Sequence, residues 1–134
     1  GFIGLDVEAT GDQISFEGEP VMFSYDMPSG AQTVKLQILN EAGRTVRTVD
    51  LDKTPGKQGF TWDGRNKDGE TVEPGAYTVK IAAIDYEKRA LEVPTTVYGR
   101  VSGIETNEKG ETLLMMGTVK LTLDQIRSAV KPAA

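Results

Sequence analysis

Apolar and polar residues alternate along most of this chain, which is the pattern of β-strands that bury one face. The alternation is clearest in segments 21–27 and 33–38, and it recurs near the N-terminus and after residue 90. The apolar positions in these runs are Val21, Phe23, Tyr25 and Met27; Val34, Leu36 and Ile38; Ile3, Leu5 and Val7; and Leu91, Val93 and Val97. The pattern predicts an all-β protein.

Turn residues separate these runs. Residues 40–43 (NEAG) predict a short hairpin loop, in which Gly43 can take a positive φ. In the returning strand the alternation slips by one residue between Val46 and Val49, which predicts a β-bulge there. Further short strands are predicted at 99–106, 111–116 and 117–122, with a turn over 107–110.

One helix is predicted, at the C-terminal end. Thr122 and Gln125 are spaced as the N-cap and N3 residues of a capping box. Leu123, Ile126 and Val130 follow at helical spacing, and Pro132 ends the pattern. A helix of about eight residues is unstable alone in water, so it must pack on a sheet.

The number of strands is too large for one small sandwich. Residues 17–90 supply five or six strands, and the flanking segments 1–16 and 91–134 supply four or five more. The sequence therefore predicts two β units, with 17–90 inserted into a unit that the two flanks build together. Such insertions are tolerated because domain termini often lie close together at the surface.

Composition removes several classes of function. The 134 residues include no histidine and no cysteine, so the usual Ser-His-Asp, Cys-His, zinc and disulfide chemistry is not expected. A net charge of −5 disfavours nucleic acid as a partner. No apolar run approaches the ~18 residues of a membrane helix, and no membrane association is expected. Because the chain opens at Gly1 without a methionine, we expect a fragment of a longer protein.

The turn-rich stretch 60–81 (FTWDGRNKDGETVEPGAYTVKI) is the strongest candidate for a ligand site. With Gly69 at position 6 of a calcium loop, Asn66 and Asp68 fit positions 3 and 5. Glycines fall on positions 1 and 12, where the strongest ligands belong. The pattern therefore favours a plain turn, in which Asn66 and Asp68 bond their own backbone, and it predicts no specific calcium dependence.

Acidic side chains in the same stretch raise the possibility of glycosidase-like chemistry, which needs only two carboxylates. They are Asp63, Asp68, Glu70 and Glu73. Nothing in the sequence marks a cleft around them or a raised pKa. We therefore assign no catalytic, cofactor-binding or metal-binding residue, and we expect no enzyme activity and no cofactor.

A structural role explains more of this stretch. Pro74-Gly75 is predicted to form a type II turn. Tyr77 follows the turn and precedes the core position Val79 by two residues, as in the tyrosine corner of immunoglobulin-like sandwiches. Trp62 and Tyr77 are therefore predicted to be buried anchors of a sandwich built without a disulfide.

An unbroken apolar run, Leu113–Met116, predicts a strand with both faces buried. Core packing is the favoured interpretation. The alternative is contact with a partner or a second copy, because methionine suits adaptable surfaces.

The stretch 60–81 resembles the Phe-x-Trp-Asp-Gly … Asp-Gly … Gly-x-Tyr signature of the flagellar hook-capping family (FlgD), in its immunoglobulin-like or fibronectin-III-like module. Residues 34–51 (VKLQILNEAGRTVRTVDL) are similar to the hairpin before that signature, and 97–126 (VYGRVSGIETNEKGETLLMMGTVKLTLDQI) is similar to the family's C-terminal segment. The resemblance implies an immunoglobulin/fibronectin-III-like sandwich inserted into a Tudor-like β-barrel.

The resemblance also implies a function. A member of this family would be a non-enzymatic scaffold that is exported through the flagellar secretion channel, caps the growing hook in several copies, and guides assembly of the hook protein. The alternative is an adhesion or carbohydrate-binding β module of a secreted bacterial protein.

Overall fold

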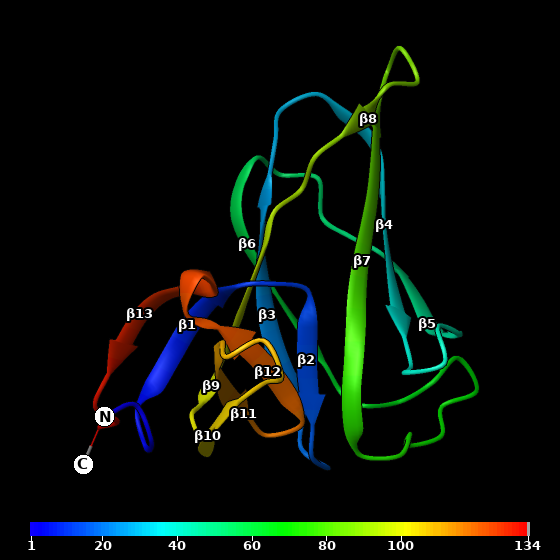
Figure 1. Ribbon diagram of the computed structural model, residues 1–134. Coiled ribbons are helices and arrows are strands. Elements are labelled where there is room, and N and C mark those ends of the chain that lie inside the picture. The colour runs from blue at the N-terminus through cyan, green and yellow to red at the C-terminus, as the bar shows by residue number, and fades with distance from the viewer. Residues whose placement is uncertain (134) are drawn as a thin grey trace.

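The computed structural model describes residues 1–133 and is built almost entirely of antiparallel strands (Figure 1). A single 3-10 turn is the only helical element among these residues. The strands are β1 (Asp6–Thr10), β2 (Gln13–Phe16), β3 (Val21–Met27), β4 (Ala31–Leu39), β5 (Thr45–Asp50), β6 (Gly56–Trp62), β7 (Gly75–Asp85), β8 (Ala90–Leu91), β9 (Thr95–Arg100), β10 (Gly103–Thr106), β11 (Thr112–Met116), β12 (Val119–Thr122) and β13 (Ile126–Val130). The all-β prediction is confirmed.

Three sheets make up the molecule. One has the strand order β13-β1-β9-β3-β6, a second has the order β2-β7-β4-β5 with β8 added on β7, and the third is β10-β11-β12. Strand β9 pairs with β1 on one side and with β3 on the other. The first sheet therefore joins strands of the central segment to strands of both flanks.

The first two sheets face each other over an apolar core. The alternating residues of β3 and β4 point into it as predicted: Phe23, Tyr25 and Met27 and then Val34, Leu36 and Ile38 are all buried. The outward positions of β4 are polar, as in an antiparallel sheet with one solvated face. On β3 the outward positions are mixed: Asp26 is exposed, Ser24 is buried, and Met22 is an exposed apolar residue. Period-two patterning thus determines which face of each strand is inside.

The hairpin after β4 forms as predicted, and Gly43 takes a φ of 82°. The predicted bulge is present, at the first residue of the segment 46–49 in which it was expected. Ile38 lies opposite Arg47 and Leu39 opposite Thr45, so that Val46 has no partner in the ladder. The extra residue accounts for the slip in alternation.

One part of the apolar core lies under the third sheet. Leu114 and Met116 of β11 are fully or almost fully buried, together with Val119 and Leu121 of β12. A Cβ atom placed on Gly99 of β9 would be only 2.4 Å from Met116 Cγ, so Met116 occupies space that any other residue at 99 would fill. The core interpretation of this apolar run is confirmed for Leu114 and Met116.

The predicted C-terminal helix is wrong. Residues Leu123–Gln125 form one 3-10 turn, and Ile126–Val130 then forms β13 along the open edge of β1. The capping interaction itself is present, since Gln125 Oε1 accepts a 2.9 Å hydrogen bond from the Thr122 backbone N–H. Pairing with β1 satisfies the backbone N–H and C=O groups along one edge of this segment. A helix of about eight residues would be only marginally stable, because short helices need extensive packing.

The predicted closed barrel is also not formed by residues 1–133. Strands β10–β12 form a separate sheet, which no strand ladder connects to β13. The chain bends after β9, where Val101 bonds to the backbone of Leu5 and Ser102 to that of Met115. Side-chain packing around Met116 and Gly99, rather than a closed ring of hydrogen bonds, holds this region together.

Candidate functional site

The turn-rich stretch contributes an aromatic cluster to the sandwich core. The rings of Trp62 and Tyr77 lie 5.0 Å apart in an edge-on arrangement, and Phe16 lies 5.4 Å from Trp62. Trp62 is 1% exposed, and its indole Nε1–H donates to the Arg65 carbonyl at 3.0 Å. The Tyr77 hydroxyl donates to the Glu73 carbonyl at 2.6 Å, which confirms the tyrosine corner. Both aromatic residues therefore anchor their own loop.

Sequence patterning did not single out Phe16 as a member of this cluster. It lies in the short strand β2, which pairs with β7 and places Phe16 opposite Gly75. Gly64 packs against Phe16 and could have indicated this contact, since a Cβ at residue 64 would be 2.2 Å from the Phe16 ring. Pro74-Gly75 does not form the predicted type II turn, because Gly75 has a φ of 157° and opens β7 in a nearly extended conformation.

The polar side chains of the loop are used by its turns. Asn66 Oδ1 accepts from the backbone N–H groups of Asp68 and Glu70 at 2.9 and 3.0 Å. Asp63 Oδ1 accepts from the Arg65 N–H and lies 3.6 Å from Arg47. Within residues 1–133 no group of three or more potential ligands could hold a metal ion. The loop geometry is that of successive backbone turns.

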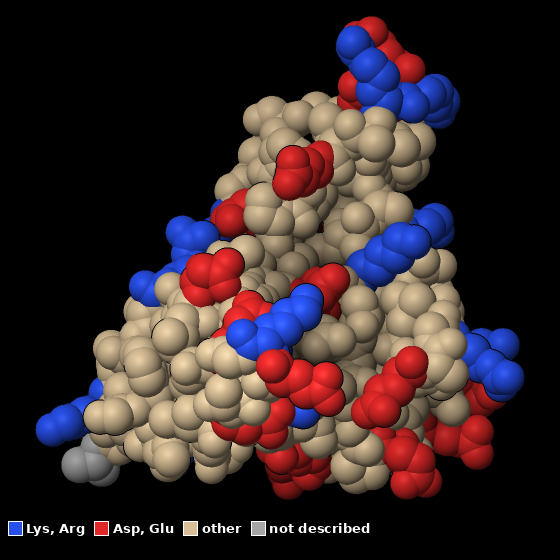
Figure 2. Space-filling model, viewed as in Figure 1, with Lys and Arg blue, Asp and Glu red and all other residues tan. Residues whose placement is uncertain are grey.

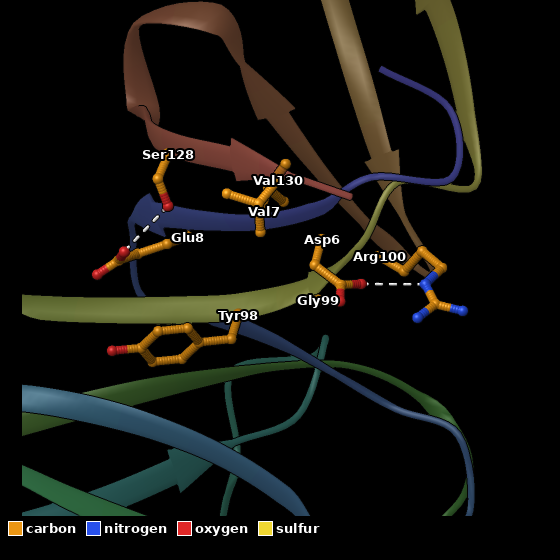
Figure 3. Close-up of a pocket in the computed structure, with 8 residues that line it drawn as sticks. All are labelled: Asp6, Val7, Glu8, Tyr98, Gly99, Arg100, Ser128 and Val130. Carbon is orange, nitrogen blue, oxygen red and sulfur yellow. Dashed lines mark hydrogen bonds and ion pairs between the residues drawn. The ribbon is translucent and has the colours of Figure 1, made fainter. Parts of the chain in front are cut away.

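A shallow groove crosses the outer face of β13, β1 and β9 and is the candidate functional site (Figure 3). Its volume is about 540 Å³. It is lined by Asp6, Val7, Glu8, Tyr98, Gly99, Arg100, Ser128 and Val130. These residues come from opposite ends of the chain, and the register of β1 with β9 and β13 brings them together.

Charges in this groove are paired across strands. Arg100 Nε lies 3.0 Å from Asp6, and Glu8 accepts a 3.1 Å hydrogen bond from the Ser128 hydroxyl (Figure 3). Lys57 of β6 lies 3.5 Å from Glu8. The two carboxylates are thus matched by two cationic side chains.

Tyr98 connects the groove to the sandwich. Its hydroxyl and the Ser24 hydroxyl of β3 are 2.8 Å apart, and Lys57 Nζ lies 5.9 Å from the centre of its ring. The Tyr98 hydroxyl raises the pKa of Lys57, and the nearby Glu8 adds to the rise. Tyrosine and arginine are residue types that are enriched in protein interfaces. Sequence reasoning did not find this site, because β1 and β9 are more than 80 residues apart.

None of the helical structure in residues 1–133 is both long enough and apolar enough to cross a bilayer.

The chain is thus an all-β protein, a disulfide-free sandwich with a groove on its outer sheet. The FlgD Ig-like domain model matches residues 11–86, and the chain therefore belongs to the FlgD family. It is 31% identical over 109 residues to the basal-body rod modification protein FlgD of Escherichia coli and 32% identical over 110 residues to that of Salmonella typhimurium. Both alignments cover 81% of this chain and 47% of the relative, so the chain spans about half the length of these relatives.

Solved structures extend the similarity to nearly the whole chain. FlgD from Pseudomonas aeruginosa is 19% identical, with a TM-score of 0.77 over 95% of this chain and 96% of that one. Truncated FlgD from Helicobacter pylori is 28% identical, with a TM-score of 0.56 over 99% and 97%. FlgD from Xanthomonas campestris, described as giving insights into the hook capping essential for flagellar assembly, has a TM-score of 0.72 at 18% identity and covers 93% of this chain and 91% of its own.

Proposed function

We propose that this chain is part of a scaffold subunit that caps the growing bacterial flagellar hook and acts by contact alone. The observation that carries the proposal is membership of the FlgD family, because a relative in that family is described in terms of hook capping. The charge-balanced groove supports a binding role over a catalytic one, since its carboxylates are engaged with Arg100, Ser128 and Lys57.

The finer steps belong to the same proposal. The full-length protein is exported through the flagellar secretion channel, several copies assemble at the extracellular tip of the hook, and they guide incoming hook subunits into place. No cofactor takes part. The groove over β13, β1 and β9 is the surface that we assign to the hook protein, with Tyr98 and Arg100 as its anchors.

The scaffold would be built from two structural units. We propose a sandwich over residues 17–90 and a discontinuous second unit over 1–16 and 91–134. The hydrogen bond between the Tyr98 and Ser24 hydroxyls and the ladder that pairs β9 with β3 support a stiff connection between them. A stiff subunit is suited to guiding others, because a rigid surface loses less conformational entropy when it binds.

The test is hook growth in cells that lack their own cap, supplied with the full-length protein and scored by electron microscopy. Full-length protein should restore hooks, and the 134-residue chain should not. In the full-length protein, replacing the carboxylates of 63–73 by alanine should reduce stability at most. Loss of hooks with a well-folded carboxylate variant, or failure of the unaltered full-length protein, would contradict the contact-only role.

The groove assignment has its own matched pair of variants. Arg100→Glu breaks an exposed ion pair in the groove, whereas Lys35→Glu breaks an exposed pair of similar length with Asp50 on the opposite sheet. We expect Arg100→Glu to abolish binding to purified hook protein and Lys35→Glu to retain it. Equal effects would remove the groove from the proposal, and binding to a glycan array instead of hook protein would favour the adhesion module.

A further inference from the structure

A second groove lies at the loop end of the sandwich, away from the one in Figure 3. It runs between the β4–β5 hairpin loop and residues 72–77 and has a volume of about 410 Å³. Val46, Val72 and Ala76 line it with apolar surface, and all three are half-buried against the core. The bulge at Val46 contributes to this floor, since Val46 is the residue left out of the ladder.

Two carboxylates, those of Glu41 and Glu73, stand at the rim of the groove. Both line the groove together with Tyr77. Burial raises the pKa of the Tyr77 hydroxyl first, and the charges of Glu73 and Glu41 raise it further. The Glu41 carboxylate also lies 3.4 Å from the point where a Cβ on Gly75 would be, so it faces the groove. Among residues 1–133, neither carboxylate has an ion-pair partner within 4.0 Å.

The surrounding loops are acidic as well. Segments 17–20, 40–44 and 63–74 contain seven acidic residues and three basic residues, a net charge of −4 out of −5 for the whole chain. Red side chains gather along the lower edge of Figure 2, the end where β2 finishes and β7 begins in Figure 1. This end of the molecule therefore attracts positive charge.

We propose that the groove binds an arginine or lysine side chain presented by a partner protein. The apolar floor would cover the aliphatic stem, and the two carboxylates would receive the charged head. Arginine fits better than lysine, because its planar guanidinium can donate to both carboxylates at once. A hard metal ion fits poorly, since calcium requires six to eight oxygen ligands and the floor is hydrocarbon.

The pocket lies on the sandwich and is tested below without hook protein, so the titration can fail while the hook assay succeeds, and the reverse. Glu73 is also among the carboxylates replaced in the hook assay, so that variant is repeated there with Glu73 retained.

The experiment is an NMR titration of the isotopically labelled 134-residue chain with Nα-acetyl-arginine amide. Nα-acetyl-citrulline amide is the matched probe, because it has the same shape without the charge. Backbone amide signals of Glu41, Val46, Val72 and Ala76 should shift with the arginine probe and shift at least about fivefold less with citrulline. Equal shifts with both probes would overturn the proposal.

Variants then locate the binding. The double substitution Glu41→Gln and Glu73→Gln should weaken the arginine probe about tenfold or more, because two charge-assisted hydrogen bonds become neutral. Glu108→Gln is the control, since Glu108 is also exposed in a hairpin turn and has no ion pair among residues 1–133. Each variant's amide spectrum reports whether it is folded. Unchanged binding in the double variant, or equal weakening in Glu108→Gln, would show only general attraction to an acidic surface and would contradict the proposal.

Discussion

Two parts of the apolar core of this molecule are built in different ways. Under the paired sheets of the sandwich, the rings of Phe16, Trp62 and Tyr77 fill the core with their centres 5.0 to 6.4 Å apart. Under β10–β12, the cluster consists of aliphatic side chains and Met116, which lies against the bare backbone of Gly99.

The difference lies in what each cluster holds in place. Trp62 and Tyr77 carry polar atoms that bond to loop carbonyls, so the aromatic core also fixes the loop over 63–74. The second cluster has no such polar atoms, and its fit depends on the absence of a side chain at Gly99. Both regions need a glycine that leaves room for a neighbouring side chain, Gly64 beside Phe16 and Gly99 beside Met116. Only the aromatic region also holds a loop in place through polar atoms of its rings.

The largest expected effect is in the aromatic core. Trp62→Ala should lower the free energy of unfolding by about 3–5 kcal/mol, because it removes a fully buried ring and leaves a cavity. Urea denaturation followed by circular dichroism measures it. Leu114→Ala is the corresponding truncation in the other cluster, with an expected loss of about 2–5 kcal/mol. A loss under ~1 kcal/mol for Trp62→Ala would refute its role as the main core anchor.

An added methyl group at Gly99 should be damaging as well. Gly99→Ala places a Cβ within 2.4 Å of Met116 and should destabilise the fold by about 1–3 kcal/mol through overpacking. Gly59→Ala is the control in the same sheet, where the nearest atom, Met22 Sδ, is 4.0 Å away. It should leave the midpoint of unfolding nearly unchanged. Adding Met116→Ala to Gly99→Ala should cost less than the two single losses combined, and simple additivity would show that residues 99 and 116 do not compete for space.

A smaller effect is expected from the hydroxyl of the tyrosine corner. Tyr77→Phe removes the hydrogen bond to the Glu73 carbonyl and should cost about 1 kcal/mol. Tyr86→Phe is the control, because Tyr86 is 69% exposed and should lose almost nothing. Similar stability of both variants would contradict an energetic role for the corner.

The same hydroxyl should make stability depend on alkaline pH. Burial, and then Glu73 and Glu41, raise the pKa of Tyr77 above its ordinary value of 10.0. Below pH 10 the hydroxyl is protonated in both the folded and the unfolded chain, and its contribution is complete. Above that pH the unfolded chain loses its proton first, so stability falls as the pH rises through the folded pKa. Denaturation midpoints between pH 8 and 11 should fall less steeply for Tyr77→Phe. A residual slope remains, since burial raises the pKa of Tyr25 as well.

Local patterning predicted much of the fold. Alternation located the buried faces of β3 and β4, the NEAG loop gave its hairpin, and the slip near Val46 marked its bulge. The aromatic anchors were also predictable, because Trp62 and Tyr77 lie directly beside turns, at the ends of strands whose apolar face is buried. In each case the signal lies within a few residues of the structure it describes.

The grooves and the C-terminal strand were not predictable in this way. Residues 126–130 have apolar spacing compatible with a helix, and only the free edge of β1, more than 110 residues earlier, turns them into a strand. Both grooves likewise depend on register between distant segments: β1 with β9 and β13 in one, and the β4–β5 hairpin with the start of β7 in the other.

The sequence by itself therefore determined the inward faces of β3 and β4, the hairpin between β4 and β5, the aromatic anchors and the family to which the chain is similar. Tertiary structure alone decided which strand edges pair, which carboxylates form ion pairs, and that Met116 packs against Gly99. The physical reason is the distance along the chain over which each feature is determined. Strand formation, turn geometry and burial of alternate residues follow from neighbouring side chains and the backbone, whereas edge pairing, charge pairing and close packing depend on surfaces that exist only once the chain has folded.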